Sequence, residues 1–326
     1  MVMKIDFKKI KTNSAATRVN LVTVDNLLTP GKETSDWNAE GFENLCEKII
    51  DARKNKKAVI LSMGAHVIKN GLARYLIAMM EQGIVTHISG NGACSIHDFE
   101  LCLLGGTSEH VPTAIEDGSF GMWEETGHYM NEAIQKGATQ GIGYGESLAV
   151  YMDKFPERFP HKECCVLYQA HRLKIPITYH IALGTDIIHQ HPTVDFGAIG
   201  TTSGIDFKKM CESVADLENG VFLNFGSGVI GPEVFLKALS IARNLGYGIK
   251  NVTTANFDLR PVQDVHGRKE HNDPDYYYRP IKNVVCRPTS QGGNGWHFCG
   301  DHKDTIPALY NKIIEMRQRD EQPTNC

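Results

Sequence analysis

Short apolar runs that end in glycine alternate with segments of helical spacing along most of this chain. The runs "KKAVILSMGA" (56–65) and "IVTHISGNG" (84–92) are rich in residues that favour strands. The segments "GLARYLIAMMEQG" (71–83) and "SIHDFELCLLGG" (95–106) carry apolar residues at helical spacing. Strands that alternate with helices in this way form a mostly parallel sheet with right-handed crossovers. The sequence therefore predicts an α/β fold.

The same alternation continues through the second half of the chain. Strands are predicted in "IPITYHIALGTD" (175–186), "VFLNFGSG" (221–228) and "IKNVTTANFD" (249–258). Helices are predicted in "CCVLYQAHRLK" (164–174), "IDFKKMCESVADLENG" (205–220), "PEVFLKALSIARNLG" (232–246) and "IPALYNKIIEMRQR" (306–319). Residues 106–160 interrupt the pattern and are expected to form an insertion or lid, and 259–295 a polar loop that covers a site. No linker divides the chain, so we expect one domain over residues 1–326.

The composition is that of an ordinary soluble globular protein. Charged residues make up 22% of the 326 residues and the formal net charge is −4, which gives no reason to expect nucleic-acid binding. No run approaches 18 apolar residues and the N-terminus lacks the apolar core of a secretory signal, so no membrane association is expected. The nine cysteines show no CxxC spacing, which favours a reduced, cytoplasmic setting.

Small residues follow most of the predicted strands. The turns are Gly64-Ala65-His66, Ser89-Gly90-Asn91-Gly92, Gly184-Thr185-Asp186, Gly226-Ser227-Gly228, Thr253-Thr254-Ala255 and Gly300-Asp301-His302. In an open parallel sheet the ligand crevice lies at the carboxyl ends of the strands, where glycine lets backbone N–H groups approach a pyrophosphate. The turns therefore predict a nucleotide crevice in a Rossmann-like, doubly wound sheet. The first strand–helix unit has no G-x-G-x-x-G fingerprint.

Three of these segments together resemble the deoxyhypusine synthase family. They are "GAHVIKNGLARYLIAMMEQGIVTHISGNG", "IPITYHIALGTD" and "GVFLNFGSGVIGPEVFLKALSIARNLGYGIKNVTTANFD". The resemblance implies a deoxyhypusine synthase-like NAD-binding fold, NAD-dependent transfer or oxidation on a small amine or polyamine, and a homotetramer. It also implies NAD contacts at Ala65, His66, Lys69, Asn70, Ser89, Gly90, Asp186, Gly226, Ser227, Gly228, Thr254, Ala255 and Asp301.

Two catalytic features of that family have no counterpart here. Pro232 and Glu233 stand where the family has a histidine after its glycine turn, and no Trp-Gly-Lys segment precedes the last strand. Lys282 is the lysine nearest to that segment and is the candidate for an imine. The candidates for a catalytic base and for carboxylates that hold an amine are His97, Asp98, Glu124, Glu125, His128 and Glu233.

Two other interpretations remain open from the sequence. The missing lysine and histidine are compatible with a non-catalytic relative that binds NAD or scaffolds an assembly. The motif "DIIHQHP" places His189 and His191 at i and i+2, which on a strand would direct both side chains to one face. With Asp186, His180 or His302 they could bind a metal and support a metal-dependent hydrolase.

Overall fold

The predicted apolar runs form a six-stranded parallel sheet with the order β5-β3-β2-β6-β7-β8. A computed structural model describes residues 5–33, 35–262, 265 and 275–321. The strands are β2 (Val59–Met63), β3 (His87–Asn91), β5 (Ile177–His180), β6 (Val221–Phe225), β7 (Thr253–Asp258) and β8 (Asn294–Cys299). This order is that of a doubly wound sheet, so the predicted fold class is confirmed.

Helices connect the strands and cover both faces of the sheet. They are α1 (Phe42–Lys54), α2 (His66–Lys69), α3 (Ala73–Glu81), α4 (Gly92–Leu104), α5 (Val111–Asp117), α6 (Glu124–Gln140), α7 (Tyr144–Lys154), α8 (Val166–Arg172), α9 (Phe196–Ala215), α10 (Ile230–Asn244) and α11 (His302–Glu321). Shorter turns are η1 (Phe7–Lys9), η2 (Ala15–Thr17), η3 (Val24–Asn26), η4 (Pro156–Arg158), η5 (Lys162–Cys164), η6 (Ile187–Gln190) and the π-helix η7 (Ile281–Cys286). Within the described ranges, no helix has the length and apolar character that crossing a bilayer requires.

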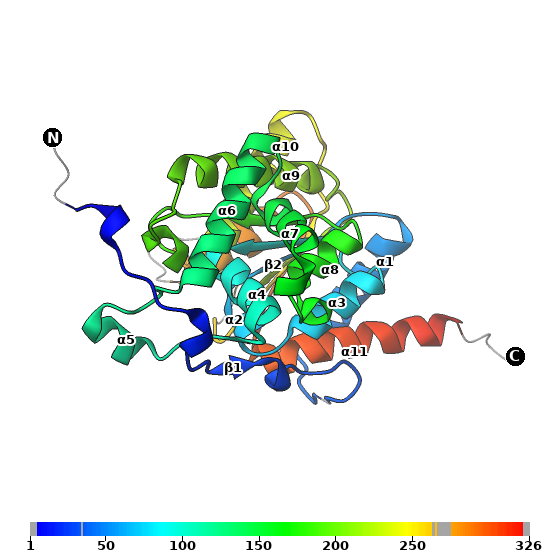
Figure 1. Ribbon diagram of the computed structural model, residues 1–326. Coiled ribbons are helices and arrows are strands. Elements are labelled where there is room, and N and C mark those ends of the chain that lie inside the picture. The colour runs from blue at the N-terminus through cyan, green and yellow to red at the C-terminus, as the bar shows by residue number, and fades with distance from the viewer. Residues whose placement is uncertain (1–4, 34, 263–264, 266–274, 322–326) are drawn as a thin grey trace, which may run out of the picture.

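Alternate residues of the central strands β2 and β6 enter two hydrophobic cores. Leu61 and Met63 of β2 belong to the larger core, which α1, α3 and α11 cover, whereas Ile60 packs into the smaller core under α9, α10 and η7. Figure 1 shows α9 and α10 on one side of the sheet and α3 and α11 on the other. The central strands β2 and β6 are buried along their whole length, so each reads in the sequence as a nearly continuous apolar run, whereas the edge strand β8 is partly exposed.

The segment 106–160 begins with β4 (Gly106–Thr107), which pairs antiparallel with β1 (Val22–Thr23). It also contains α6 and α7, and apolar residues of both helices, such as Met130 and Leu148, belong to the larger core. Most of the predicted insertion is therefore an integral part of the fold. The predicted site-covering loop 259–295 lies partly outside the described residues, at 263–264 and 266–274, and its described part includes η7.

Candidate functional site

The winding of the sheet reverses between the neighbouring strands β2 and β6. The chain adds β3 and β5 on one side of β2, and β7 and β8 on the other side of β6. Ligands of doubly wound sheets bind outside the carboxyl ends of the strands at such a point. The two backbones touch there, since a Cβ on Gly64 would lie 2.5 Å from the carbonyl oxygen of Gly226. Gly226 itself has a φ of +67°, and its Cβ would lie 2.4 Å from Nε2 of His302.

The turn after β6 leaves successive backbone amides free at the start of α10. Among the residues that the structure describes, none accepts a hydrogen bond from the N–H of Ser227, Gly228 or Val229. The helix begins at Ile230 without a side-chain cap, and Gly228 is exposed. Free N–H groups before a helix attract anions, phosphate groups above all. We refer to the amides of residues 227–229 as the anion cradle.

A row of polar side chains that the sequence analysis did not single out supports this turn. Ser62, Asn224, Asn256 and His297 are register partners on β2, β6, β7 and β8. Asn224 Nδ2 donates to the carbonyl of Ser227 at 3.0 Å and to Asn256 Oδ1 at 2.7 Å. Asn256 Nδ2 in turn lies 2.9 Å from Nδ1 of His297. The row fixes the backbone of the anion cradle, and its signal in the sequence was an asparagine inside the apolar run of β6.

A cavity of about 260 Å³ lies at the carboxyl ends of β3 and β5, since Ala93 and Asp186, which follow these strands, line it. The single turn α2 begins beside the crevice, two residues after Gly64, and ends at Lys69, which lines the cavity. Two residues that the sequence singled out, His97 and Asp186, also line it, so the fold brings these two together. We refer to this space as the Asp186 cavity.

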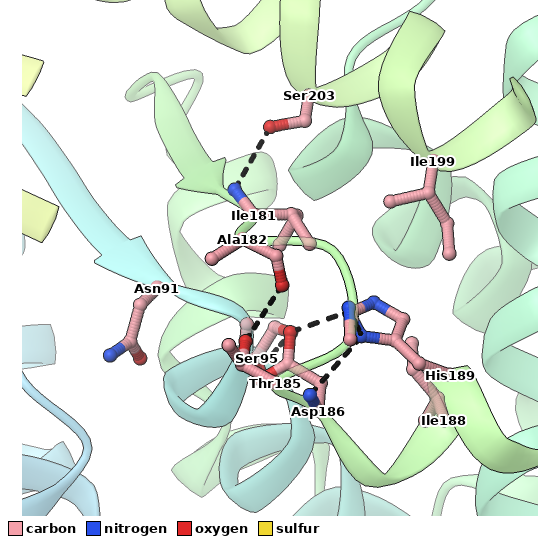
Figure 2. Close-up of polar contacts among 12 residues, drawn as sticks. Asn91, Ser95, Ile181, Ala182, Thr185, Asp186, Ile188, His189, Ile199 and Ser203 are labelled. Atoms are coloured by element: carbon pink, nitrogen blue, oxygen red, sulfur yellow. Dashed lines mark hydrogen bonds and ion pairs between the residues drawn. The ribbon is translucent and has the colours of Figure 1, made fainter. Parts of the chain in front are cut away.

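Asp186 follows β5 and is held by its own loop. Its Oδ2 has no hydrogen-bond partner among the described residues and rests against Gly92, where a Cβ would lie 1.9 Å away. His189 folds back so that Nδ1 accepts from the N–H groups of Gly184 and Asp186, each at 3.1 Å (Figure 2). Burial raises the pKa of Asp186 to about 6, so this carboxyl can exchange a proton close to neutral pH.

His97 presents an unprotonated ring nitrogen to the same cavity. Burial lowers its pKa to about 4, so the ring is neutral at pH 7. The hydroxyl of Thr107 donates to Glu100 Oε2 at 2.6 Å and lies 2.7 Å from Nδ1 of His97. Because the hydroxyl proton is committed to Glu100, Nδ1 must donate to the hydroxyl oxygen. Nε2 then carries the lone pair and can act as an acceptor or base.

A buried ion pair between Arg18 and Glu100 closes the far side of the cavity. Nη1 of Arg18 lies 2.6 Å from Oε1 of Glu100, and the two side chains are 2% and 1% exposed. Glu100 Oε1 also accepts from the hydroxyl of Thr126 at 2.9 Å. Sequence reasoning missed both partners. Glu100 gave a usable signal, because a charge inside the apolar face of a helix needs a partner, but Arg18 gave none.

Asp98, predicted as catalytic, caps a helix instead. Its carboxylate accepts from the N–H groups of Val166 and Leu167 at 3.0 and 2.7 Å, at the start of α8. The side chain is fully buried and does not line the Asp186 cavity. These contacts give Asp98 a structural role, and nothing in the geometry supports the catalytic role predicted for it.

Glu125 and His128, also predicted as catalytic, lie on the outer part of α6. Glu125 accepts from the hydroxyl of Ser14 at 2.7 Å and from the N–H of Ala15 at 2.6 Å. It therefore anchors η2, the turn that precedes Arg18. His128 is half-buried, with Nδ1 3.4 Å from Oε1 of Glu124. Neither Glu125 nor His128 lines the cavity.

Lys282 belongs to η7, on the α10 side of the sheet. Its ammonium lies 5.5 Å from the centre of the Tyr277 ring, and it does not line the Asp186 cavity. An imine between Lys282 and an amine-derived substrate in that cavity has no support in this geometry.

The remaining residues predicted to contact the cofactor fall into two groups. His66 is the first residue of α2, which Ala65 and Asn70 flank, and Asp301 directly precedes α11, so these four lie at helix ends. The prediction that Ser89, Gly90, Thr254 and Ala255 belong to turns after strands is wrong. Ser89 and Gly90 lie within β3, and Thr254 and Ala255 are fully buried in β7. Their cofactor contacts stay predictions.

The histidine pair does not have the strand geometry on which the metal hypothesis relied. His189 belongs to the turn η6 and His191 directly follows it, so the strand that would direct both side chains to one face is not formed. Nδ1 of His191 lies 2.8 Å from the hydroxyl of Thr193, and Nε2 lies 3.3 Å from Glu124. Over the described ranges, no three His, Cys, Asp or Glu side chains are placed to hold a metal ion.

Comparison with known proteins supports the fold. No protein-family model matches the chain, and no curated protein matches it. The chain is 14% identical to AgrE, solved as a ternary complex with ornithine and NAD+, with a TM-score of 0.52 over 87% of this chain and 34% of AgrE. It therefore spans about a third of the AgrE chain.

Two further structures are similar over most of their length. A protein described as LOR/SDH from Methanococcus maripaludis S2 is 14% identical, with a TM-score of 0.52 over 94% of this chain and 76% of that one. A protein described as a deoxyhypusine synthase from Entamoeba histolytica is 11% identical, with a TM-score of 0.47 over 89% of this chain and 83% of that one. The first likeness shows the fold, which is consistent with NAD binding, whereas the second is too weak to assign the family. The chain has the Rossmann-like α/β fold predicted from its sequence.

Proposed function

We propose that this chain is an NAD-dependent enzyme that acts on a small amine bound in the Asp186 cavity. The observation that supports it most is that two features share the carboxyl edge of the sheet. One is the anion cradle after β6, and the other is a cavity with a buried carboxyl group whose pKa is raised to about 6. AgrE, which shares the fold, was solved with NAD+ and an amino acid together.

The crevice fits a dinucleotide in its chemistry. The free N–H groups of Ser227, Gly228 and Val229 are donors for a pyrophosphate, and the exposed Gly226 and Gly228 let it approach the backbone. Nδ1 of the buried His302 has no hydrogen-bond partner among the described residues, and Nε2 of the same ring lies against Gly226 of this turn. NAD, when bound, supplies a hydride acceptor.

The residues of the cavity fit the proton transfers that amine oxidation needs. When a carbon next to an ammonium nitrogen loses hydride, the nitrogen becomes an iminium and releases one proton. Asp186, which is ionised above about pH 6, holds the cation and can take that proton. Nε2 of the neutral His97 is a second acceptor in the same cavity.

Two measurements, made one after the other, test the proposal. Calorimetry with NAD+ measures cofactor binding directly, and NADH absorbance after addition of amines measures turnover. We expect binding and NADH formation with at least one small amine. Binding without NADH formation from any amine would favour the non-catalytic NAD-binding alternative, and the absence of NAD binding would contradict the proposal.

The homotetramer that the family resemblance implies is also part of this proposal. Sedimentation equilibrium of the purified chain measures the oligomeric state, and a monomer would contradict the expected assembly.

A further inference from the structure

Four side chains that line the Asp186 cavity each hold one buried polar atom without a partner among the described residues. These atoms, which lack a hydrogen bond, are Nη2 of Arg18, Oγ of Ser108, Oε2 of Glu109 and Oδ2 of Asp186. The last lies 3.7 Å from Nε2 of His189, beyond hydrogen-bond distance. The side chains of Arg18 and Asp186 are only 2% and 6% exposed. Buried polar atoms in native proteins nearly always have a hydrogen-bond partner. Four unpartnered atoms around one cavity therefore indicate a ligand that carries several polar groups.

The four atoms have opposite hydrogen-bonding characters. The Nη2 of Arg18 can only donate, and the hydroxyl of Ser108 can donate, whereas the carboxylates of Glu109 and Asp186 accept. Lys69 lines the same cavity, and its ammonium forms no ion pair or hydrogen bond with any described residue. The cavity thus offers donors for an anion and acceptors for a cation.

Arg18 is held rigidly by its other contacts. Nε donates to Oδ1 of Asn20 at 2.8 Å and Nη1 donates to Oε1 of Glu100 at 2.6 Å. The guanidinium lies 5.4 Å from the centre of the Trp123 ring. A guanidinium stays protonated, so its remaining Nη2 group is a fixed, charged donor. Such a group recognises a carboxylate with little ordering cost.

We infer that the Asp186 cavity binds an amino acid, with its carboxylate on Nη2 of Arg18 and Oγ of Ser108 and its ammonium on Asp186 or Glu109. This inference rests on the proposed function, because it takes the cavity as the site of the amine substrate. A diamine carries cations only and would bring one of them towards Arg18 or Lys69 as a like charge. The volume of about 260 Å³ lies below the usual range for drug-sized ligands, which fits a single small amino acid.

L-Ornithine and putrescine test this inference, because they differ only in the carboxylate. Calorimetry with each compound, in the presence and in the absence of NAD+, measures their affinities for the unmodified protein. We expect L-ornithine to bind at least about tenfold more tightly than putrescine, as a charge-assisted contact with a buried guanidinium requires. Equal or tighter binding of putrescine, or no binding of either compound, would overturn the inference.

Arg18→Lys assigns the preference to the guanidinium. Lysine keeps a positive charge opposite Glu100 but removes the Nη2 group. We expect the preference for L-ornithine to fall below about threefold, while the affinity for NAD+ stays within about twofold. A folded Arg18→Lys protein that retains the full preference would overturn the inference.

Ser108→Ala provides the same readout if Arg18→Lys does not fold. No described residue bonds the hydroxyl of Ser108, so its removal leaves the fold intact. We expect weaker binding of L-ornithine and unchanged binding of putrescine. The NAD+ titration separates the two proposals, since loss of NAD binding with a retained L-ornithine preference contradicts the proposed function alone.

Discussion

The carboxylate oxygen Oδ2 of Asp186 rests against Gly92, the first residue of α4. Asp186 follows β5 and Gly92 follows β3, so this contact joins the ends of two neighbouring strands. The start of a helix favours the ionised form of a carboxyl group, whereas burial favours the neutral form. Burial dominates here, because the pKa of Asp186 is raised to about 6.

Gly92→Ala is expected to displace Asp186. The new Cβ would lie 1.9 Å from Oδ2, so the loop after β5 must move. We expect a loss of stability of about 1–3 kcal/mol from overpacking and a loss of NADH formation. Urea unfolding and NADH absorbance measure the two effects.

Gly200→Ala is the matched control for that substitution. Gly200 lies inside α9, and a Cβ there would meet nothing within 4 Å. Alanine at this exposed helical position is expected to stabilise the fold by about 0.5–1 kcal/mol and to leave NADH formation unchanged. Equal effects of the two substitutions would contradict the importance of the contact between Gly92 and Asp186.

Asp186→Asn is expected to change the pH dependence of stability. Burial raises the pKa of Asp186 from 3.8 to about 6, so the folded state favours the protonated form. The contribution of Asp186 to stability is complete below pH 3.8 and is lost as the pH rises through 6. The free energy of unfolding of the variant should therefore exceed that of the parent protein by up to about 3 kcal/mol at pH 8. At pH 4 the two proteins should differ little. Urea unfolding at the two pH values measures the difference, and an equal difference at both would refute the pKa assignment.

Asp98→Asn separates a structural role from a catalytic one. Asparagine has one acceptor oxygen, so one N–H of Val166 or Leu167 loses its partner, at a cost of about 1–3 kcal/mol. We expect a lower melting temperature, with unchanged NAD+ affinity and unchanged NADH formation by the folded protein. A fall in NADH formation without a fall in stability would restore the catalytic role.

Lys282→Ala is expected to leave NADH formation intact, because Lys282 does not line the Asp186 cavity. Borohydride added during turnover should leave Lys282 unmodified, as mass spectrometry of the digested protein would show. A reduced amine adduct on Lys282 would show instead that the chemistry passes through an imine.

The fold could be predicted because each element has a local cause. Strands such as β6 are apolar runs buried on both faces, and glycines such as Gly226 are required where two strand ends meet. The turn after β6 could be recognised for the same reason. Helix α9 begins nine residues before the predicted start at 205, since Asp195 caps it through the N–H of Ala198.

Much of the site could not be predicted, because it depends on contacts between distant segments. Arg18 meets Glu100 across 82 residues of sequence, and no spacing rule connects them. Asp98 is two residues from Glu100 and also carries a carboxyl group, but that group accepts from the N–H groups at the start of α8. The metal hypothesis for "DIIHQHP" needs its histidines on a strand, but the chain forms the turn η6 there. Tertiary packing therefore decides that Glu100, and not Asp98, lines the cavity.

Binding of NAD+ in the anion cradle is the central claim, and calorimetry with Gly228→Asp and Gly248→Asp tests it most directly. A Cβ at either glycine would meet nothing within 4 Å, so both variants should fold, and each adds one negative charge. Gly228 lies in the anion cradle, whereas Gly248 lies in the exposed loop before β7, at the amino edge of the sheet. We predict that Gly248→Asp binds NAD+ like the unmodified protein and that Gly228→Asp binds it at least about tenfold more weakly. Equal affinity of all three proteins would contradict the account.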